Sequence, residues 1–117
     1  MTKYECADIY VEMEQKYPEM INAFEDITHD MLQLFCMKQQ DYGPKNIGMG
    51  SEVVDTEQKV KLSLMALSVR INDKVQRLLN LTTTDKEPNN ESLEDTFMDI
   101  ANYAVMSLIV KRKQWGK

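Results

Sequence analysis

Hydrophobic residues recur at three- and four-residue spacing along most of the chain, which predicts helices and not strands. The first helical region runs from about residue 4 to residue 40, and Pro18 breaks it or begins a second helix at its first turn. The apolar positions of this region follow the spacing of a buried face: Met20, Phe24, Ile27, Met31, Leu34 and Phe35. The turn residues of DYGPKNIGMGS, at residues 41–51, then predict a loop.

A second long helix is predicted from Asp55 and Thr56 to about Leu81, with Gln58 completing a capping box with Asp55. One of its faces is apolar: Val60, Leu64, Leu67, Ile71, Val75 and Leu78. After the polar connector TTTDKEPNN, a last helix is expected to begin near Asn90 and to end in the basic sequence KRKQW. These segments predict an all-α bundle of three long helices plus a short N-terminal helix, as a single domain over residues 1–117.

The last helix is apolar around most of its circumference but carries one polar row. The apolar face consists of Leu93, Phe97, Ile100, Ala104 and Leu108, and the row roughly opposite consists of Asp95, Asp99 and Asn102. Such a helix is buried centrally or against a second subunit, and the row would then face an enclosed cleft. We expect a homo-oligomer, either a dimer or larger. Two carboxylates about 6 Å apart repel by about 3 kcal/mol at an effective dielectric near 20. A buried pair therefore needs Mg²⁺, Mn²⁺ or basic side chains, whereas a solvated flank needs neither.

Basic residues gather on the second helix, away from its apolar face. Arg70, Lys74 and Arg77 lie there together with Asp73, which is expected to join the acidic row as a third metal ligand. Because Arg and Lys hold phosphate oxygens, this side predicts a groove for an anion. A solvated face with an ion pair between Asp73 and Arg77 is the alternative.

The stretch before and within the first loop combines Lys38, Asp41, Tyr42 and Asn46. An aromatic ring for stacking, an amide for a base edge and a lysine for phosphate together favour nucleotide recognition. A simple helix end and turn is the alternative interpretation.

Composition and charge narrow the function further. The chain has 117 residues, 43% of them hydrophobic and 28% charged, and a net charge of −5, which argues against coating of bulk nucleic acid. No signal peptide or membrane span is recognised, so we expect a cytoplasmic protein with free thiols. Two cysteines and one histidine do not make a structural zinc site, and neither a P-loop nor a dinucleotide fingerprint is present.

Three blocks and a closing motif, taken in order, carry a family resemblance. KQQDYGPKNIGMG, RINDKVQRLLNL, NESLEDTFMDIANYAVMSLI and the closing RKQW resemble the nucleotide modification associated domain 1 family over about residues 30–117. The resemblance implies a protein of bacteriophages and prophages, distantly similar to all-α MazG-like and dimeric dUTPase-like pyrophosphohydrolases, which hold magnesium with acids of two helices. This chain departs from their Glu-x-x-Glu and Glu-x-x-Asp patterns, because Asp73 has no second acid nearby and Asp95 and Asp99 are four residues apart.

The resemblance and the residues together predict a nucleotide between the two later helices and the loop. Phosphates are assigned to Lys38, Arg70, Lys74 and Arg77, base or sugar to Tyr42 and Asn46, with Asp41 and Asn102 beside them, and metal or catalysis to Asp73, Asp95 and Asp99. Three roles stay open at this point. They are a magnesium-dependent pyrophosphohydrolase, a sponge that sequesters a nucleotide signal of host defence, and a plain interaction protein.

Overall fold

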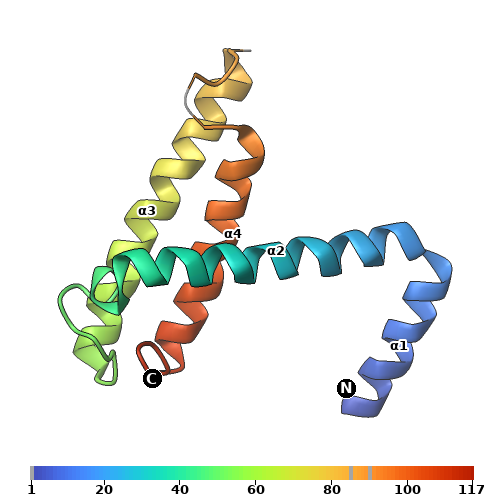
Figure 1. Ribbon diagram of the computed structural model, residues 1–117, viewed down its shortest axis with the longest axis horizontal. Coiled ribbons are helices and arrows are strands. Elements are labelled where there is room, and N and C mark those ends of the chain that lie inside the picture. The colour runs from blue at the N-terminus through green and yellow to red at the C-terminus, as the bar shows by residue number, and fades with distance from the viewer. Residues whose placement is uncertain (1, 85, 90) are drawn as a thin grey trace. The chain divides into compact units, whose positions relative to one another are not determined.

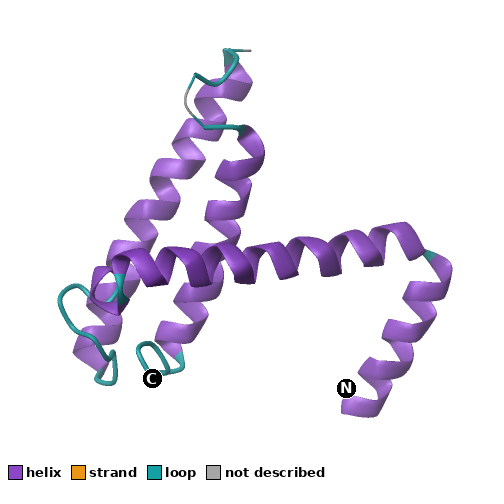
Figure 2. Cartoon of the chain, viewed as in Figure 1, coloured by secondary structure: helices purple, strands orange, loops and turns teal. Residues whose placement is uncertain are grey.

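The computed structural model is all-α, as the sequence predicts (Figure 1). It describes residues 2–84, 86–89 and 91–117, which form four α-helices and no strand. The helices are α1 (Lys3–Lys16), α2 (Pro18–Tyr42), α3 (Glu57–Thr83) and α4 (Leu93–Lys111), and a short 3-10 helix, η1 (Pro44–Asn46), follows α2. The prediction of three long helices after a shorter one is confirmed, and loops make the longer connections (Figure 2).

The chain divides into two compact units, Met1–Leu34 and Phe35–Lys117. The boundary falls inside α2, so the first unit contains α1 and most of α2, while the last turns of α2 belong with α3 and α4 in the second. One continuous helix, α2, crosses this boundary. That residues 1–117 form a single domain stays a prediction. Among the described residues, no helix is both long and apolar enough to cross a membrane.

In the first unit, the helix boundaries follow local chemistry. The Thr2 hydroxyl accepts a hydrogen bond from the Glu5 N–H, and the Glu5 carboxylate accepts one from the Thr2 N–H at 2.8 Å, so α1 begins with a capping box. Pro18 begins α2, where its missing N–H costs nothing. The predicted burial of the α2 face is wrong in this unit: Met20, Phe24 and Ile27 are 56%, 70% and 50% exposed.

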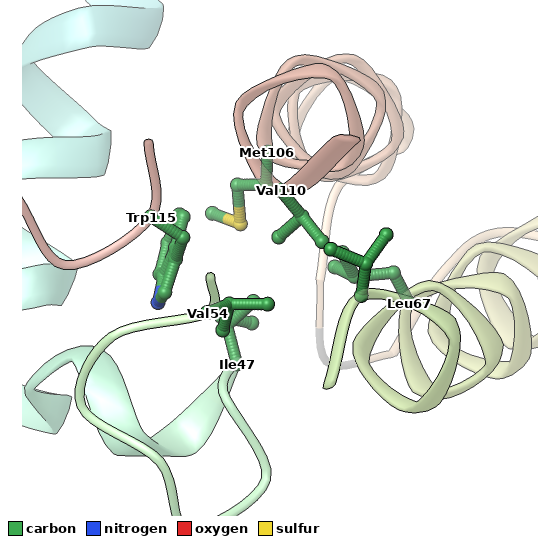
Figure 3. Close-up of a cluster of buried hydrophobic side chains, with 7 residues drawn as sticks. Ile47, Val54, Leu67, Met106, Val110 and Trp115 are labelled. Atoms are coloured by element: carbon green, nitrogen blue, oxygen red, sulfur yellow. The ribbon is translucent and has the colours of Figure 1, made fainter. Parts of the chain in front are cut away.

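In the second unit, α3 and α4 lie side by side and enclose the core together with the chain segments at their lower ends (Figure 1). The buried hydrophobic cluster contains Ile47, Val54, Val60, Leu67, Met106, Val110 and Trp115. Figure 3 shows Leu67 of α3 facing Val110 of α4, with Trp115, Ile47 and Val54 closing the other side. The long loop after α2 is therefore part of the core and not a free connection.

Trp115 fastens this loop. Its indole N–H donates to the Pro44 carbonyl oxygen at 2.9 Å, and its own carbonyl oxygen accepts from the Val54 N–H at 3.2 Å. The ring packs edge-on against Phe35, with ring centroids 5.9 Å apart. The segment after α4 thus holds the loop that carries Asn46, and Asn46 lines a pocket of the second unit.

The starts of α3 and α4 are set by hydroxyl caps. Thr56, not Asp55, caps α3 by accepting from the Lys59 N–H at 3.2 Å, so the predicted capping box of Asp55 and Gln58 is wrong. Ser92 caps α4 by accepting from the Asp95 N–H at 3.0 Å. The start predicted at Asn90 lies outside the described residues, and α4 begins at Leu93.

Candidate functional site

A cavity of about 170 Å³ lies in the second unit, where the last turns of α2, the loop after it, α3 and α4 meet. We call it the amide–tyrosine pocket, after its three amides and two tyrosines. Its lining consists of Lys38, Gln39, Tyr42, Asn46, Ile47, Arg70, Asp99, Asn102, Tyr103 and Met106. Six of these ten residues are among the predicted site residues: Lys38, Tyr42, Asn46, Arg70, Asp99 and Asn102.

One face of α4 forms a wall of the pocket. Asp99, Asn102, Tyr103 and Met106 stand at positions i, i+3, i+4 and i+7, so they share a side of the helix. Asn102 is 7% exposed, and the side chain of Asp99 is 12% exposed. The polar row of this apolar helix therefore faces inward for Asp99 and Asn102. Asp95, one turn earlier, is exposed and lies outside the pocket lining.

Lysines from two helices neutralise the inward-facing carboxylate. Asp99 Oδ1 lies 3.0 Å from Lys38 Nζ of α2, and its Oδ2 lies 2.9 Å from Lys74 Nζ of α3. Lys74 also pairs with Glu91 at 3.1 Å. Burial alone would raise the pKa of Asp99, but the hydrogen bonds from Lys74 and Lys38 outweigh burial and hold this pKa below its ordinary value.

The same contacts raise the pKa of Lys74. Burial would lower the pKa of this ammonium group, but its hydrogen bonds to Asp99 and Glu91 outweigh burial and raise it. Both groups are thus charged at neutral pH. The carboxylate of α4 takes its counter-charge from lysines, which is the basic-partner alternative that the sequence left open.

Arg70 and Tyr42 stand beside this ion-pair cluster. Arg70 Nη2 donates to the backbone oxygen and the Oδ1 of Asn46 at 3.4 and 3.3 Å, both long for hydrogen bonds. The bonds that the described residues give Arg70 use only this nitrogen, so the rest of its planar fork is available to a ligand. Tyr42 lines the same pocket with 66% of the residue exposed, which leaves ring surface for stacking.

Other predicted residues do not line the pocket. Arg77 donates to the Thr96 hydroxyl and to the Glu91 carbonyl oxygen, so it ties α3 to the start of α4. Thr96 is fully buried and also donates to the Glu91 carboxylate at 3.0 Å. Asp41 and Asp73 are exposed and absent from the lining.

The predicted metal ligands are not gathered in one place. The described residues contain no group of three or more His, Cys, Asp or Glu side chains that could hold a metal ion. Both oxygens of Asp99 already accept from lysines, whereas magnesium in proteins takes carboxylate oxygens that are free to bind it. The donors present in this arrangement therefore do not fit magnesium.

Three polar residues at or beside the pocket are not among the predicted site residues: Gln39, Tyr103 and Glu91. Helical spacing could have found the first two, because Gln39 stands three residues before Tyr42, and Tyr103 four residues after Asp99. Glu91 has no such signal, since it precedes α4 and meets Lys74 of a different helix.

The second unit is thus all-α and carries a polar pocket lined by cations, amides and tyrosines. The chain belongs to the nucleotide modification associated domain 1 family, whose model matches residues 38–110. The matched segment begins at Lys38 and includes every residue that lines the pocket. Comparison with curated proteins and with solved structures gives no match.

Proposed function

We propose that the amide–tyrosine pocket binds a nucleotide. One observation carries the proposal: cations, amides and an exposed aromatic ring line a single pocket inside the segment that matches a nucleotide-associated family. Phosphate, base edge and base face each need one of these three kinds of group. An interaction surface for a protein partner would not require all three within one cavity.

The cations around the pocket favour an anionic ligand, although the chain as a whole carries a net negative charge. Around the pocket, Lys38 and Lys74 pair with Asp99 and Glu91, and Arg70 lines the cavity without a carboxylate partner among the described residues, which leaves one positive charge in excess. Lys38 is the more exposed of the two lysines, with 42% of its side chain exposed against 22% for Lys74, and its ion-pair partner is Asp99. A phosphate can therefore draw Lys38 away from Asp99 and take the open side of the Arg70 fork.

The amides and Tyr42 are suited to the base. An amide presents a donor and an acceptor side by side, as a base edge requires, and the Tyr42 ring can stack on the base face. The cavity of about 170 Å³ is smaller than the roughly 300–1,000 Å³ of pockets that enclose a whole drug-sized ligand. We therefore assign the enclosed space to one part of the nucleotide, with the remainder lying over the exposed side of Lys38 and Tyr42.

Holding the nucleotide fits these residues better than cleaving it. Phosphoryl transfer needs charge neutralisation at phosphorus and a carboxylate or similar group to orient the attacking water. Among the described lining residues, Asp99 is the carboxylate, and both of its oxygens are engaged by lysines. The proposed role is thus sequestration of a nucleotide, and the magnesium-dependent pyrophosphohydrolase is the second candidate, which only the remote likeness of the family supports.

The test combines binding with recovery of the ligand. Purified protein is screened by thermal shift against mono-, di-, tri- and cyclic nucleotides of each base, with magnesium or with EDTA, and bound ligand is then identified by mass spectrometry after denaturation. Sequestration predicts that one nucleotide raises the stability in EDTA, by about 2.7 kcal/mol at 100 times its Kd, and is recovered intact. Cleaved products formed only with magnesium would establish the hydrolase instead, and no shift with any nucleotide would refute binding.

A matched pair of variants ties the result to the pocket. Arg70→Ala removes a pocket cation and should abolish most of the shift, because the planar guanidinium is the best phosphate donor there. Arg112→Ala removes the same charge from an exposed position outside the lining and should leave the shift unchanged. Equal losses in both variants would mean that the nucleotide responds to overall charge and not to this site.

A further inference from the structure

The side of α4 that faces away from the pocket carries an apolar stripe, which is exposed except at the half-buried Ala101. Its members alternate at three- and four-residue spacing: Glu94, Phe97, Ala101, Ala104, Leu108 and Lys111. Phe97 and Leu108 are 59% and 54% exposed, although the sequence predicts this face to be buried. Alternate spacing of three and four is the pattern of a seam along which two helices pack.

The stripe is complementary to itself when it is reversed. If two copies of α4 cross in opposite directions at the midpoint between Ala101 and Ala104, each of these alanines meets the other in the partner copy. Phe97 then meets Leu108, and Glu94 meets Lys111, at both ends of the contact. Such reciprocal pairing is what a two-fold symmetric interface requires.

Charge selects this orientation. The exposed residues at the start of α4 are acidic, Glu94 and Asp95, and those at its end are basic, Lys111 and Arg112. An antiparallel pair places acid against base at both ends, whereas a parallel pair places like charges together. The small alanines at the centre let the two backbones approach closely, and the large apolar residues fill the space on either side.

We propose that a second copy of this chain docks on the outer stripe of α4, antiparallel to the first, to form a two-fold symmetric dimer. The contact runs from Glu94 to Lys111, about 26 Å along each helix at 1.5 Å per residue. It leaves the pocket of each copy open, because Asp99 and Asn102 lie on the opposite side of α4. The proposal is independent of the nucleotide, since it uses none of the pocket residues.

Charge reversal tests the orientation on the full chain. In Glu94→Lys alone, or Lys111→Glu alone, both symmetry-related ion pairs become like-charge contacts, so dimerisation should weaken about tenfold. In an equimolar mixture of the two variants, opposite charges meet at both ends again, and mixed dimers should form with wild-type affinity. Sedimentation velocity with one variant labelled measures both effects.

Two controls separate docking from folding. Glu87→Lys and Lys61→Glu make the same charge changes at exposed positions outside α4 and should leave the dimer unchanged. Ala104→Arg places a long cation at the exposed crossing point and should yield a monomer with unchanged helix content by circular dichroism. A wild-type chain that stays monomeric, variants that dimerise as tightly as wild type, or a mixture that restores nothing would each overturn the proposal.

Discussion

Asp99→Asn gives two expected effects of opposite sign. The substitution keeps the size of the side chain but removes the charge that Lys38 and Lys74 share at 3.0 and 2.9 Å. We expect the folded state to lose stability and the pocket to gain affinity for a phosphate. An Asp99 that held a metal ion or contacted the nucleotide directly would instead lose affinity on this change.

The contacts set the size of the stability loss. A hydrogen bond to a charged group contributes about 1.5–3 kcal/mol, and the Lys74 contact, with side chains 22% and 12% exposed, falls in this range. The Lys38 contact is discounted to about 0.5 kcal/mol because this lysine is 42% exposed and screened by solvent. The free energy of unfolding should therefore fall by roughly 2–3.5 kcal/mol at neutral pH.

The pH dependence of the stability loss tests whether the charge of Asp99 causes that loss. The pKa of Asp99 is lowered in the folded state, so the carboxylate stabilises the fold above its ordinary pKa of 3.8, and this stabilisation is lost as the pH falls through the lower folded value. The difference between wild type and Asp99→Asn should accordingly be full at neutral pH and shrink in acid below about pH 4. Urea unfolding followed by circular dichroism at both conditions measures this difference.

Nucleotide affinity gives the deciding result. Removing one negative charge within several ångströms of the phosphate should tighten binding about tenfold, which titration calorimetry in EDTA detects. An unchanged stability would show that the ion pairs contribute nothing, and a weaker affinity in EDTA would show that Asp99 contacts the ligand. Either outcome would refute the role of Asp99 as a counter-ion that phosphate displaces.

Three further substitutions test the pocket and the loop that supports it. Tyr42→Ala should leave stability within about 0.5 kcal/mol, because the residue is 66% exposed, but weaken nucleotide binding by about 1–3 kcal/mol in calorimetry through lost stacking; unchanged affinity would place the base elsewhere. Trp115→Phe loses the donor to the Pro44 carbonyl and should cost about 1–2 kcal/mol in urea unfolding, and no loss would mean that this bond does not hold the loop. Gly116→Ala should cost about 1–3 kcal/mol, since φ is +82° and a Cβ would lie 1.9 Å from the Glu52 carbonyl oxygen; an unchanged midpoint of thermal unfolding would contradict this.

Local chemistry explains why the helices could be predicted. Pro18 begins α2, hydroxyl residues cap α3 and α4, and three-four spacing runs through each of them. Six pocket residues were also predicted, because cations, amides and tyrosines that interrupt an apolar helix or a turn are visible in sequence order. The pairing of Lys74 with Glu91 was not visible, since it depends on how two helices meet.

The orientation of α4 shows where the prediction had to fail. A helix with a strong apolar face turns that face to the core, but α4 is apolar nearly all round, so its periodicity does not choose which side is covered. In the fold, Met106 and Val110 enter the core, while Phe97 and Leu108 remain exposed. Burial of Thr96 and Asn102 follows from that choice and not from their own polarity.

By itself, the sequence determined the all-α class, the helices to within a few residues, the family and six of the residues that line the pocket. Only the tertiary structure decided that Asp99 takes its counter-charge from Lys38 and Lys74, while Asp95 and Asp73 remain in solvent. The physical reason is the distance along the chain over which each kind of interaction acts. Helix caps and periodicity act within a few residues, whereas the partner of a half-buried carboxylate is set by the packing of three helices from distant parts of the chain.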